Sequence, residues 1–257
     1  MTLTIHLNDV LQQLLSSQSG RTISKDQLIA TIDLTLLDPD ASVEALALLA
    51  DRAQTNHVAA VCVFPEHLPA FKRLSHVHLA TVINFPHGNN DLLACLAELD
   101  QAINLGAREI DYVFPYQSYL TGNRQHALNQ SDVIIQACKK RERTIKIILE
   151  TGAFTTMESV YQVSKELIAM GCDFIKTSTG KTAQGATLPD VFAILSAIKD
   201  AATEESPCGL KVSGGVKSPE QARNFAHLAE LMLGKKISAD WFRIGASSLL
   251  SELLNSK

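Results

Sequence analysis

Short apolar segments alternate with longer helical segments from about residue 29 to the end of the chain, and this alternation limits the fold more than any other feature. It is typical of a parallel sheet covered by helices. Eight strands in roughly 220 residues favour a closed (β/α)8 barrel, the TIM barrel, over an open doubly wound sheet, which remains the alternative. The predicted strands are Ile29–Asp33, Ala59–Phe64, Leu79–Asn84, Glu109–Phe114, Thr144–Glu150, Asp173–Thr177, Gly209–Val212 and Trp241–Ile244.

The first 28 residues are predicted to be a helical extension of this barrel. We expect its amphipathic helix to close the floor of the barrel or to join a partner subunit. No repeat, low-complexity tract or linker divides residues 1–257, so we predict a single domain. The apolar positions that recur at helical spacing, before the polar stretch 16–20, are Leu7, Val10, Leu11, Leu14 and Leu15.

Composition narrows the classes of function. The chain has 257 residues, of which 46% are hydrophobic and 19% charged, so it can bury one large core without disulfides or a metal. A net charge of −4 argues against broad binding to nucleic acid or anionic membranes, although a small basic pocket for a phosphate is compatible with it. There is no run of roughly 18 apolar residues and no signal-peptide pattern, so we expect a cytoplasmic protein.

Cysteine and histidine spacing gives no sign of a metal site. The five cysteines lack Cys-x-x-Cys spacing, which indicates free thiols in a reducing compartment. His76 and His78 lie on one side of a predicted strand, but no neighbouring residue in the sequence completes a set of ligands. We therefore expect no metal.

A lysine lies in the middle of the apolar, β-branched segment Phe174–Lys181. A charged side chain is costly there, so Lys176 is expected either to be paired or to have a chemical role. In a poorly solvated site the ammonium group loses affinity for its proton, and the free amine can attack a carbonyl carbon to form a Schiff base. Lys176 is the candidate nucleophile.

Lys211 has a matching setting in Gly209–Gly215, a short apolar strand that ends in a glycine pair. If the two strands are neighbours and both lysines point inward, each positive charge lowers the pKa of the other and brings one amine toward ~7–8. The alternative is that each lysine reaches a strand end or pairs with a carboxylate. Two such lysines, each followed by a glycine-bearing turn, favour the catalytic interpretation.

Asp111, within Glu109–Pro115, is the carboxylate best placed to face the barrel interior and pair with a lysine. We predict that it stabilises the lysinium form and relays protons, and the alternative role is that of a counter-ion alone. Lys146 and Glu150 are interpreted as a structural charge pair within the barrel.

The C-terminal strand ends carry the chemistry in barrels of this kind, so polar residues there are predicted to form one site. Cys62 is interpreted as a packed core thiol that a nearby aldehyde site would expose to electrophiles. Further predicted substrate contacts are Asp33, Thr35, Cys62 and Thr179.

Glycine-bearing turns after the seventh and eighth strands predict a phosphate site. Loops in these positions, together with a helix N-terminus, present backbone N–H groups to an anion. Gly214 and Gly215 occupy the first turn, and Gly245–Ser248 occupies the second. Lys181 is a candidate additional cation.

Eight ordered motifs together resemble the deoxyribose-phosphate aldolases, class I aldolases that interconvert 2-deoxy-D-ribose 5-phosphate with acetaldehyde and D-glyceraldehyde 3-phosphate. The resemblance covers nearly the whole chain from Thr31. The motifs are Asp33–Thr35, Val61–Pro65, Asn84–Gly88, Glu109–Tyr116, Glu150–Gly152, Phe174–Lys181, Lys211–Gly215 and Phe242–Ser248.

The resemblance implies that Lys176 forms the Schiff base, that Lys211 depresses its pKa and that Asp111 is the acid/base residue. It also implies deoxyribose and deoxyribonucleotide catabolism without a metal or an organic cofactor. The residues it assigns to the phosphate are Lys181, Gly214, Gly215, Ser247 and Ser248.

Two positions depart from the pattern of the family. Val212 stands where relatives more often carry proline or alanine, which we expect to alter loop stiffness more than chemistry. The chain ends Leu254–Lys257 without the terminal tyrosine that some relatives carry. We therefore expect water or another group to transfer the proton, with lower turnover.

The alternatives are a different phosphosugar aldolase or an isomerase on the same barrel, and a sugar-phosphate sensor that lacks turnover. Intact Lys176, Lys211 and Asp111 argue against the sensor. As partners we expect a small sugar phosphate, no nucleic acid and no membrane. A homo-oligomer is expected, with a dimer favoured.

Overall fold

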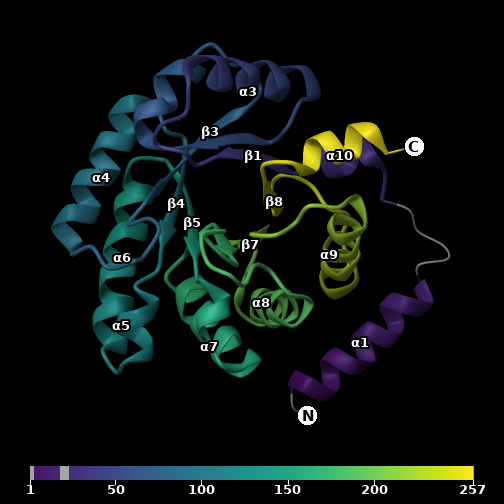
Figure 1. Ribbon diagram of the computed structural model, residues 1–257. Helices are drawn as coiled ribbons and strands as arrows, with labels where there is room; N and C mark the ends of the chain where they lie inside the picture. The colour runs from purple at the N-terminus through teal and green to yellow at the C-terminus, as the bar shows by residue number, and fades with distance from the viewer. Residues whose placement is uncertain (1–2, 18–22, 257) are drawn as a thin grey trace.

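The computed structural model, which describes residues 3–17 and 23–256, closes its parallel strands into a barrel in sequence order (Figure 1). This confirms the (β/α)8 barrel and excludes the open sheet. The strands are β1 (Ile32–Leu36), β2 (Ala60–Val63), β3 (His78–Ile83), β4 (Glu109–Val113), β5 (Thr144–Ile148), β6 (Phe174–Lys176), β7 (Gly209–Ser213) and β8 (Phe242–Ala246).

Helices follow the strands and cover the outside of the barrel (Figure 1). Apolar side chains of strands and helices meet in one large buried layer between them. Within the described residues, no helix combines the length and apolar character needed to span a bilayer. The helices are α1 (Leu3–Ser17), α2 (Lys25–Ile29), α3 (Val43–Asn56), η1 (Pro65–Phe71), α4 (Leu92–Leu105), α5 (Tyr116–Leu120), α6 (Arg124–Lys140), η2 (Thr151–Ala153), α7 (Met157–Ala169), α8 (Leu188–Ala201), α9 (Pro219–Leu233) and α10 (Leu249–Asn255).

The first strand begins at Ile32 and not at Ile29 as predicted, because a capping box starts a helix just before it. The Ser24 hydroxyl accepts a hydrogen bond from the backbone N–H of Gln27, whose side chain accepts one from the Ser24 N–H in return. The last strand, β8, likewise lies slightly later than predicted. The other strands agree with the prediction within a few residues at each end.

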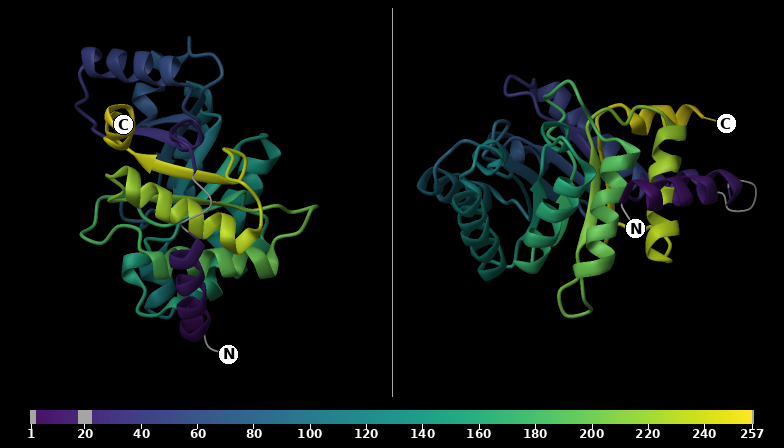
Figure 2. Two further views of the ribbon diagram at one scale, coloured as in Figure 1. Left: turned by 90° about the vertical axis from the view of Figure 1, so that its right-hand side faces the viewer. Right: turned by 90° about the horizontal axis from the view of Figure 1, so that it is seen from below.

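The N-terminal helix α1 lies on the outer wall of the barrel, where it contacts α7, α8 and α9 (Figure 2). Its buried positions include Leu7, Val10 and Leu14, whereas the predicted Leu15 is exposed. The His6 ring also packs edge-on against Phe192, at 5.4 Å between centroids. The expectation that this helix closes the barrel floor is therefore wrong. Residues 18–20 of the predicted polar stretch lie outside the described residues.

Strand register brings charged side chains together inside the barrel. Lys176 of β6 is paired with Lys211 of β7, which is paired in turn with Arg243 of β8. Asp111 of β4 is paired with Lys146 of β5. Paired residues on adjacent strands point to the same face of a sheet, and here that face is the barrel interior.

Candidate active site

Asp111 is the centre of the charged interior. Its Oδ2 atom accepts hydrogen bonds from the Nζ atoms of Lys176 and Lys211, each at 2.7 Å. Its Oδ1 atom accepts one from Lys146 Nζ at 3.0 Å. All four side chains are buried. The predicted pairing of Asp111 with a lysine and the predicted adjacency of Lys176 and Lys211 are both confirmed.

The two central lysines have opposite pKa shifts. Burial is the main cause that lowers the pKa of Lys176 below its usual range, and the charge of Lys211 lowers it further, although Asp111 opposes both. Burial also disfavours the charged form of Lys211, but Asp111 and Asp33 together raise its pKa above the usual range. The prediction that the positive charge of Lys211 lowers the pKa of Lys176 is therefore confirmed, whereas the two carboxylates keep the pKa of Lys211 above its usual range.

The predicted pair between Lys146 and Glu150 does not form. Lys146 lies within β5, whereas Glu150 lies beyond the end of the strand, where its φ angle of +57° turns the chain away from the extended conformation. Lys146 instead contacts Asp111 and Glu109, the latter at 2.5 Å. The Glu150 carboxylate accepts hydrogen bonds from the Thr179 hydroxyl at 2.5 Å and from the Thr182 hydroxyl at 3.1 Å. Lys146 belongs to the charged interior, whereas Glu150 holds the β6–α8 loop.

Arg243 and Glu109, which sequence reasoning missed, complete the charged interior together with Asp33. Arg243 of β8 donates hydrogen bonds to Asp33 at 2.7 Å and to Glu109 at 3.0 Å. Asp33, predicted as a substrate contact, is fully buried and also pairs with Lys211 at 2.5 Å. The available signal was the charged residues within otherwise apolar strands, since buried charges of opposite sign are expected to pair across a barrel.

His78 lies beside Glu109 at the base of the interior. Its Nδ1 atom lies 3.2 Å from Glu109 Oε1, and its side chain is 59% exposed. This contact could not be predicted from the sequence, because it depends on β3 and β4 being neighbours in the barrel. Among the described residues, no three His, Cys, Asp or Glu side chains converge as metal ligands do.

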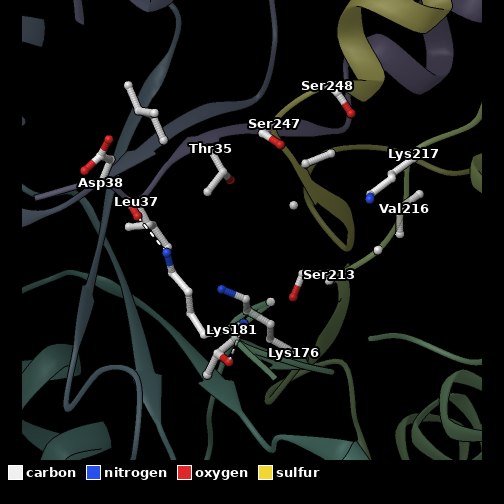
Figure 3. A pocket seen from close by; sticks show the side chains of 17 residues that line it. Thr35, Leu37, Asp38, Lys176, Lys181, Ser213, Val216, Lys217, Ser247 and Ser248 are labelled. Atoms are coloured by element: carbon white, nitrogen blue, oxygen red, sulfur yellow. Dashed lines mark hydrogen bonds between the residues drawn. The ribbon is translucent and has the colours of Figure 1, made fainter. Parts of the chain in front are cut away.

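A cavity of about 350 Å³ opens above Lys176, whose own side chain is only 4% exposed (Figure 3). Asp111, Lys211, Asp33 and Cys62 lie below it and do not reach its wall. The cavity is lined by Thr35, Leu36, Leu37, Asp38, Lys176, Thr179, Gly180, Lys181, Ser213, Gly214, Gly215, Val216, Lys217, Gly245, Ala246, Ser247 and Ser248.

The predicted phosphate residues all line this cavity, from the loops after β6, β7 and β8. Gly214 and Gly215 have φ angles of +81° and +79°, which favour glycine and let successive backbone N–H groups face one region. Gly185 is required for another reason, since a Cβ atom there would lie 2.2 Å from the Gly214 carbonyl oxygen. Close packing therefore fixes the β7–α9 turn against the β6–α8 loop.

Two lysines add positive charge at the cavity rim. Lys181, which was predicted, donates a hydrogen bond through Nζ to the Leu37 carbonyl at 2.9 Å and so joins the loops after β6 and β1. Lys217, which was missed, lies across the cavity near Ser247 and Ser248 (Figure 3). Its position just after the glycine pair was the signal that could have identified it.

The ends of β6 and β7 are fastened together below the cavity. The Thr177 hydroxyl donates to the Ser213 carbonyl at 2.9 Å and accepts from the Ser213 N–H at the same distance. The Ser213 hydroxyl donates to the Ser178 carbonyl at 2.5 Å. These bonds fix the two strands that carry Lys176 and Lys211, so the spacing of the lysines is built into the backbone.

The remaining predicted contacts have different surroundings. Thr35 lines the cavity and donates a hydrogen bond through its hydroxyl to the Asp33 carbonyl at 2.8 Å. Cys62 is fully buried in a small cluster of β2 and β3 side chains, and burial raises the pKa of its thiol. Its interpretation as a packed core thiol is confirmed, while contact with a substrate stays a prediction.

A buried amine with a depressed pKa beneath an open cavity with cationic and hydroxyl groups at its rim defines a class of protein. It is a barrel enzyme that can bind a small anionic carbonyl compound and present a lysine to it. Residues 26–253 match the model of the DeoC/LacD family aldolases. The chain belongs to this family and is an aldolase, a carbon–carbon lyase.

Solved structures agree with this assignment. The deoxyribose phosphate aldolase from Aeropyrum pernix, described as tetrameric, is 28% identical to this chain. The match covers 97% of this chain and 97% of that protein, with a TM-score of 0.76. The aldolase QR15 is 28% identical over 88% of this chain and 96% of its own, with a TM-score of 0.75. A structure from Coccidioides immitis, 21% identical over 98% of this chain and 99% of its own, shares the fold with a TM-score of 0.78.

Proposed function

We propose that the protein is a deoxyribose-phosphate aldolase that reversibly cleaves 2-deoxy-D-ribose 5-phosphate to D-glyceraldehyde 3-phosphate and acetaldehyde through a Schiff base on Lys176. One observation carries the proposal. The amine with a depressed pKa lies at the base of the cavity, and the loops that can bind a phosphate form the rim of the same cavity.

Lys176 is the proposed nucleophile. In the cleavage direction its neutral amine adds to the aldehyde carbon C1 of the open-chain sugar, and loss of water gives a protonated imine. Removal of the C3 hydroxyl proton then breaks the C2–C3 bond, and the electron pair moves to the imine nitrogen. Glyceraldehyde 3-phosphate leaves, and an enamine remains on Lys176. Protonation of its terminal carbon and addition of water release acetaldehyde and the free amine.

Asp111 is the proposed proton acceptor, directly or through a water molecule. Burial raises its pKa, but Lys146, Lys176 and Lys211 outweigh that effect and hold the pKa well below the usual range. The carboxylate form is thus the resting state. A proton taken from the substrate is then held only briefly and passes on to water or to the enamine.

The phosphate is proposed to bind at the rim, away from the reacting carbons. Backbone N–H groups of the two glycine-bearing turns and the ammonium groups of Lys181 and Lys217 supply the recognition. Binding this remote group orients C1 toward Lys176. Dephosphorylated substrate should therefore lose rate as well as affinity.

Borohydride reduction of the protein with acetaldehyde tests the proposal. Peptide mapping should find one reduced adduct, on Lys176, and an assay should detect triose phosphate and acetaldehyde released from deoxyribose 5-phosphate. Absence of an adduct would favour the isomerase or the sensor. An adduct without release of these products would favour an aldolase for another phosphosugar.

Physiological setting and assembly are proposed from the same likeness. We infer a role in deoxyribose and deoxyribonucleotide catabolism in the cytoplasm, and a homo-oligomer with a dimer favoured. The tetrameric assembly described for the Aeropyrum pernix protein makes self-association a reasonable expectation, although its subunit number belongs to that protein.

A further inference from the structure

Six charged side chains inside the barrel form a closed circuit in which carboxylates and cations alternate. Asp111 lies 2.7 Å from Lys211 on one side and 3.0 Å from Lys146 on the other. We call this set the charge ring, and its members in order are Asp33, Lys211, Asp111, Lys146, Glu109 and Arg243.

The remaining contacts close the ring. Glu109 lies 2.5 Å from Lys146 and 3.0 Å from Arg243. Asp33 lies 2.7 Å from Arg243 and 2.5 Å from Lys211. Every member thus contacts two groups of opposite sign, and all six side chains are almost completely shielded from solvent.

The charge ring is neutral, and Lys176 stands outside it. Three carboxylates balance three cations, so a protonated Lys176 would add a fourth cation whose single ionic partner, Asp111, already serves Lys146 and Lys211. A buried net charge is costly, whereas a neutral amine costs little. The charge balance therefore favours release of the proton from Lys176 and from no member of the ring.

In the part of the chain that the structure describes, the other carboxylates near these side chains form no ion pair with Lys176 or with a cation of the ring. Glu150 directs its carboxylate to the hydroxyls of Thr179 and Thr182. Cys62 is held as the thiol by burial. The further groups that face Lys176 or the ring are His78 on β3, Asp173 before β6, which accepts from the Ile145 N–H, and the rim residues Asp38, Lys181 and Lys217.

We propose that Arg243 and Glu109, neither of which reaches the cavity, are positioning residues that keep Lys176 in its reactive, uncharged form by holding the charge ring neutral. The inference rests on the proposed Schiff-base function of Lys176. It goes beyond the effect of the neighbouring Lys211, because it assigns control of the nucleophile to two charges that lie three and four ion-pair contacts away from Lys176.

Removing the charge of Arg243 and removing the charge of Glu109 should move the acidic limb of the pH profile in opposite directions. Arg243→Gln leaves the ring with one excess negative charge, so Lys176 should hold its proton to higher pH. Glu109→Gln leaves one excess positive charge, so the proton should leave at lower pH. At an effective dielectric constant of about 20, each shift should be about one pH unit. The double variant restores neutrality and should return the profile close to that of the wild type.

The readout is the pH dependence of acetylation of Lys176 by acetic anhydride, measured by peptide mapping, together with the pH profile of kcat/KM. The acetylation measures the amine itself and does not require turnover. Arg141→Gln, an exposed arginine paired with Asp100, is the matched control and should leave the profile unchanged. Thermal unfolding of each variant shows whether the barrel is intact.

Three outcomes would overturn the inference: pH profiles of both single variants shifted in the same direction, no shift in single variants that fold, or a double variant whose profile does not return to that of the wild type. A purely structural role predicts no shifts of opposite sign. If one single variant fails to fold, the direction of the shift in the other single variant, and its return toward the wild-type profile in the double variant, still decide. Failure of the proposed function gives a different result, namely no borohydride adduct in the wild type, while the acetylation profiles still test the ring.

Discussion

The barrel interior below Lys176 and the cavity above it are built on contrasting principles. The interior is closed and dry, and its charged groups are fully paired. The cavity is open, with hydroxyl groups, glycine backbone and two lysines at its rim (Figure 3). The Lys176 amine lies at the boundary, so the interior can set its protonation state while the cavity selects the substrate.

This division explains why two lysines on neighbouring strands behave differently. Lys211 lies among two carboxylates of the interior and keeps its proton. Lys176 shares one of those carboxylates with two other cations and faces the cavity. Both lysines are buried, so the number of carboxylates in contact with each lysine decides which amine loses its proton and can react.

Replacing the group at the boundary should have the largest effect. Lys176→Arg keeps a positive charge but removes the amine, so kcat/KM for cleavage should fall by more than about 10³-fold, and the borohydride adduct should disappear. Lys140→Arg, at an exposed position near the end of α6, is the control and should retain full activity. Aldol activity retained in Lys176→Arg would falsify the assignment of the nucleophile.

Asp111→Asn should disturb the charge balance of the barrel interior. The change leaves three buried lysines with one carboxylate fewer, so the free energy of unfolding should fall by about 3 kcal/mol. Loss of the proton acceptor should also lower kcat by about 10²-fold. Denaturant unfolding and steady-state kinetics measure the two effects separately. Unchanged kcat in a destabilised variant would leave Asp111 as a counter-ion alone.

Substitutions at the rim should have smaller effects, and these should be confined to substrates that carry a phosphate. Lys217→Met removes one charged contact, so KM for deoxyribose 5-phosphate should rise by about tenfold. Cleavage of 2-deoxyribose without the phosphate is the internal control and should not change. An equal loss for both substrates would place Lys217 outside phosphate recognition.

The fold and the two central lysines could be predicted from the sequence because their signals are local. Alternation of strands and helices indicates the barrel, and Lys176 and Lys211 stand out as cations in apolar strands. The start of strand β1 was harder to predict, since a capping box at Ser24 and Gln27 begins a helix that includes the apolar residues just before the strand.

Apart from the pairing of Asp111 with a lysine, the pairing of charges could not be predicted, because it depends on register across the closed barrel. Arg243 and Asp33 meet only where β8 closes on β1, and nothing near either residue in the sequence indicates the other. Proximity in sequence was misleading for Lys146 and Glu150, because Lys146 lies in β5, whereas Glu150 lies beyond the end of that strand and bonds Thr179. Long-range pairing also brings Asp111 and Asp33 to Lys211 and raises its pKa, an effect that the lysine pair alone does not indicate.

The smallest effect is expected at Glu150, just after the end of β5, and it tests how this segment supports the cavity. Glu150 holds the β6–α8 loop through the hydroxyls of Thr179 and Thr182. Glu150→Gln keeps one acceptor oxygen and loses the charge that strengthens both bonds, so kcat/KM should fall by about threefold. Lys176 should keep its acetylation profile, because the Glu150 carboxylate is directed to hydroxyl groups and not to the charged interior. Glu142→Gln, at the exposed turn before β5, is the matched control. A shift in the Lys176 profile of the Glu150 variant, with Glu142→Gln unchanged, would show that the rim and the interior are not electrostatically separate.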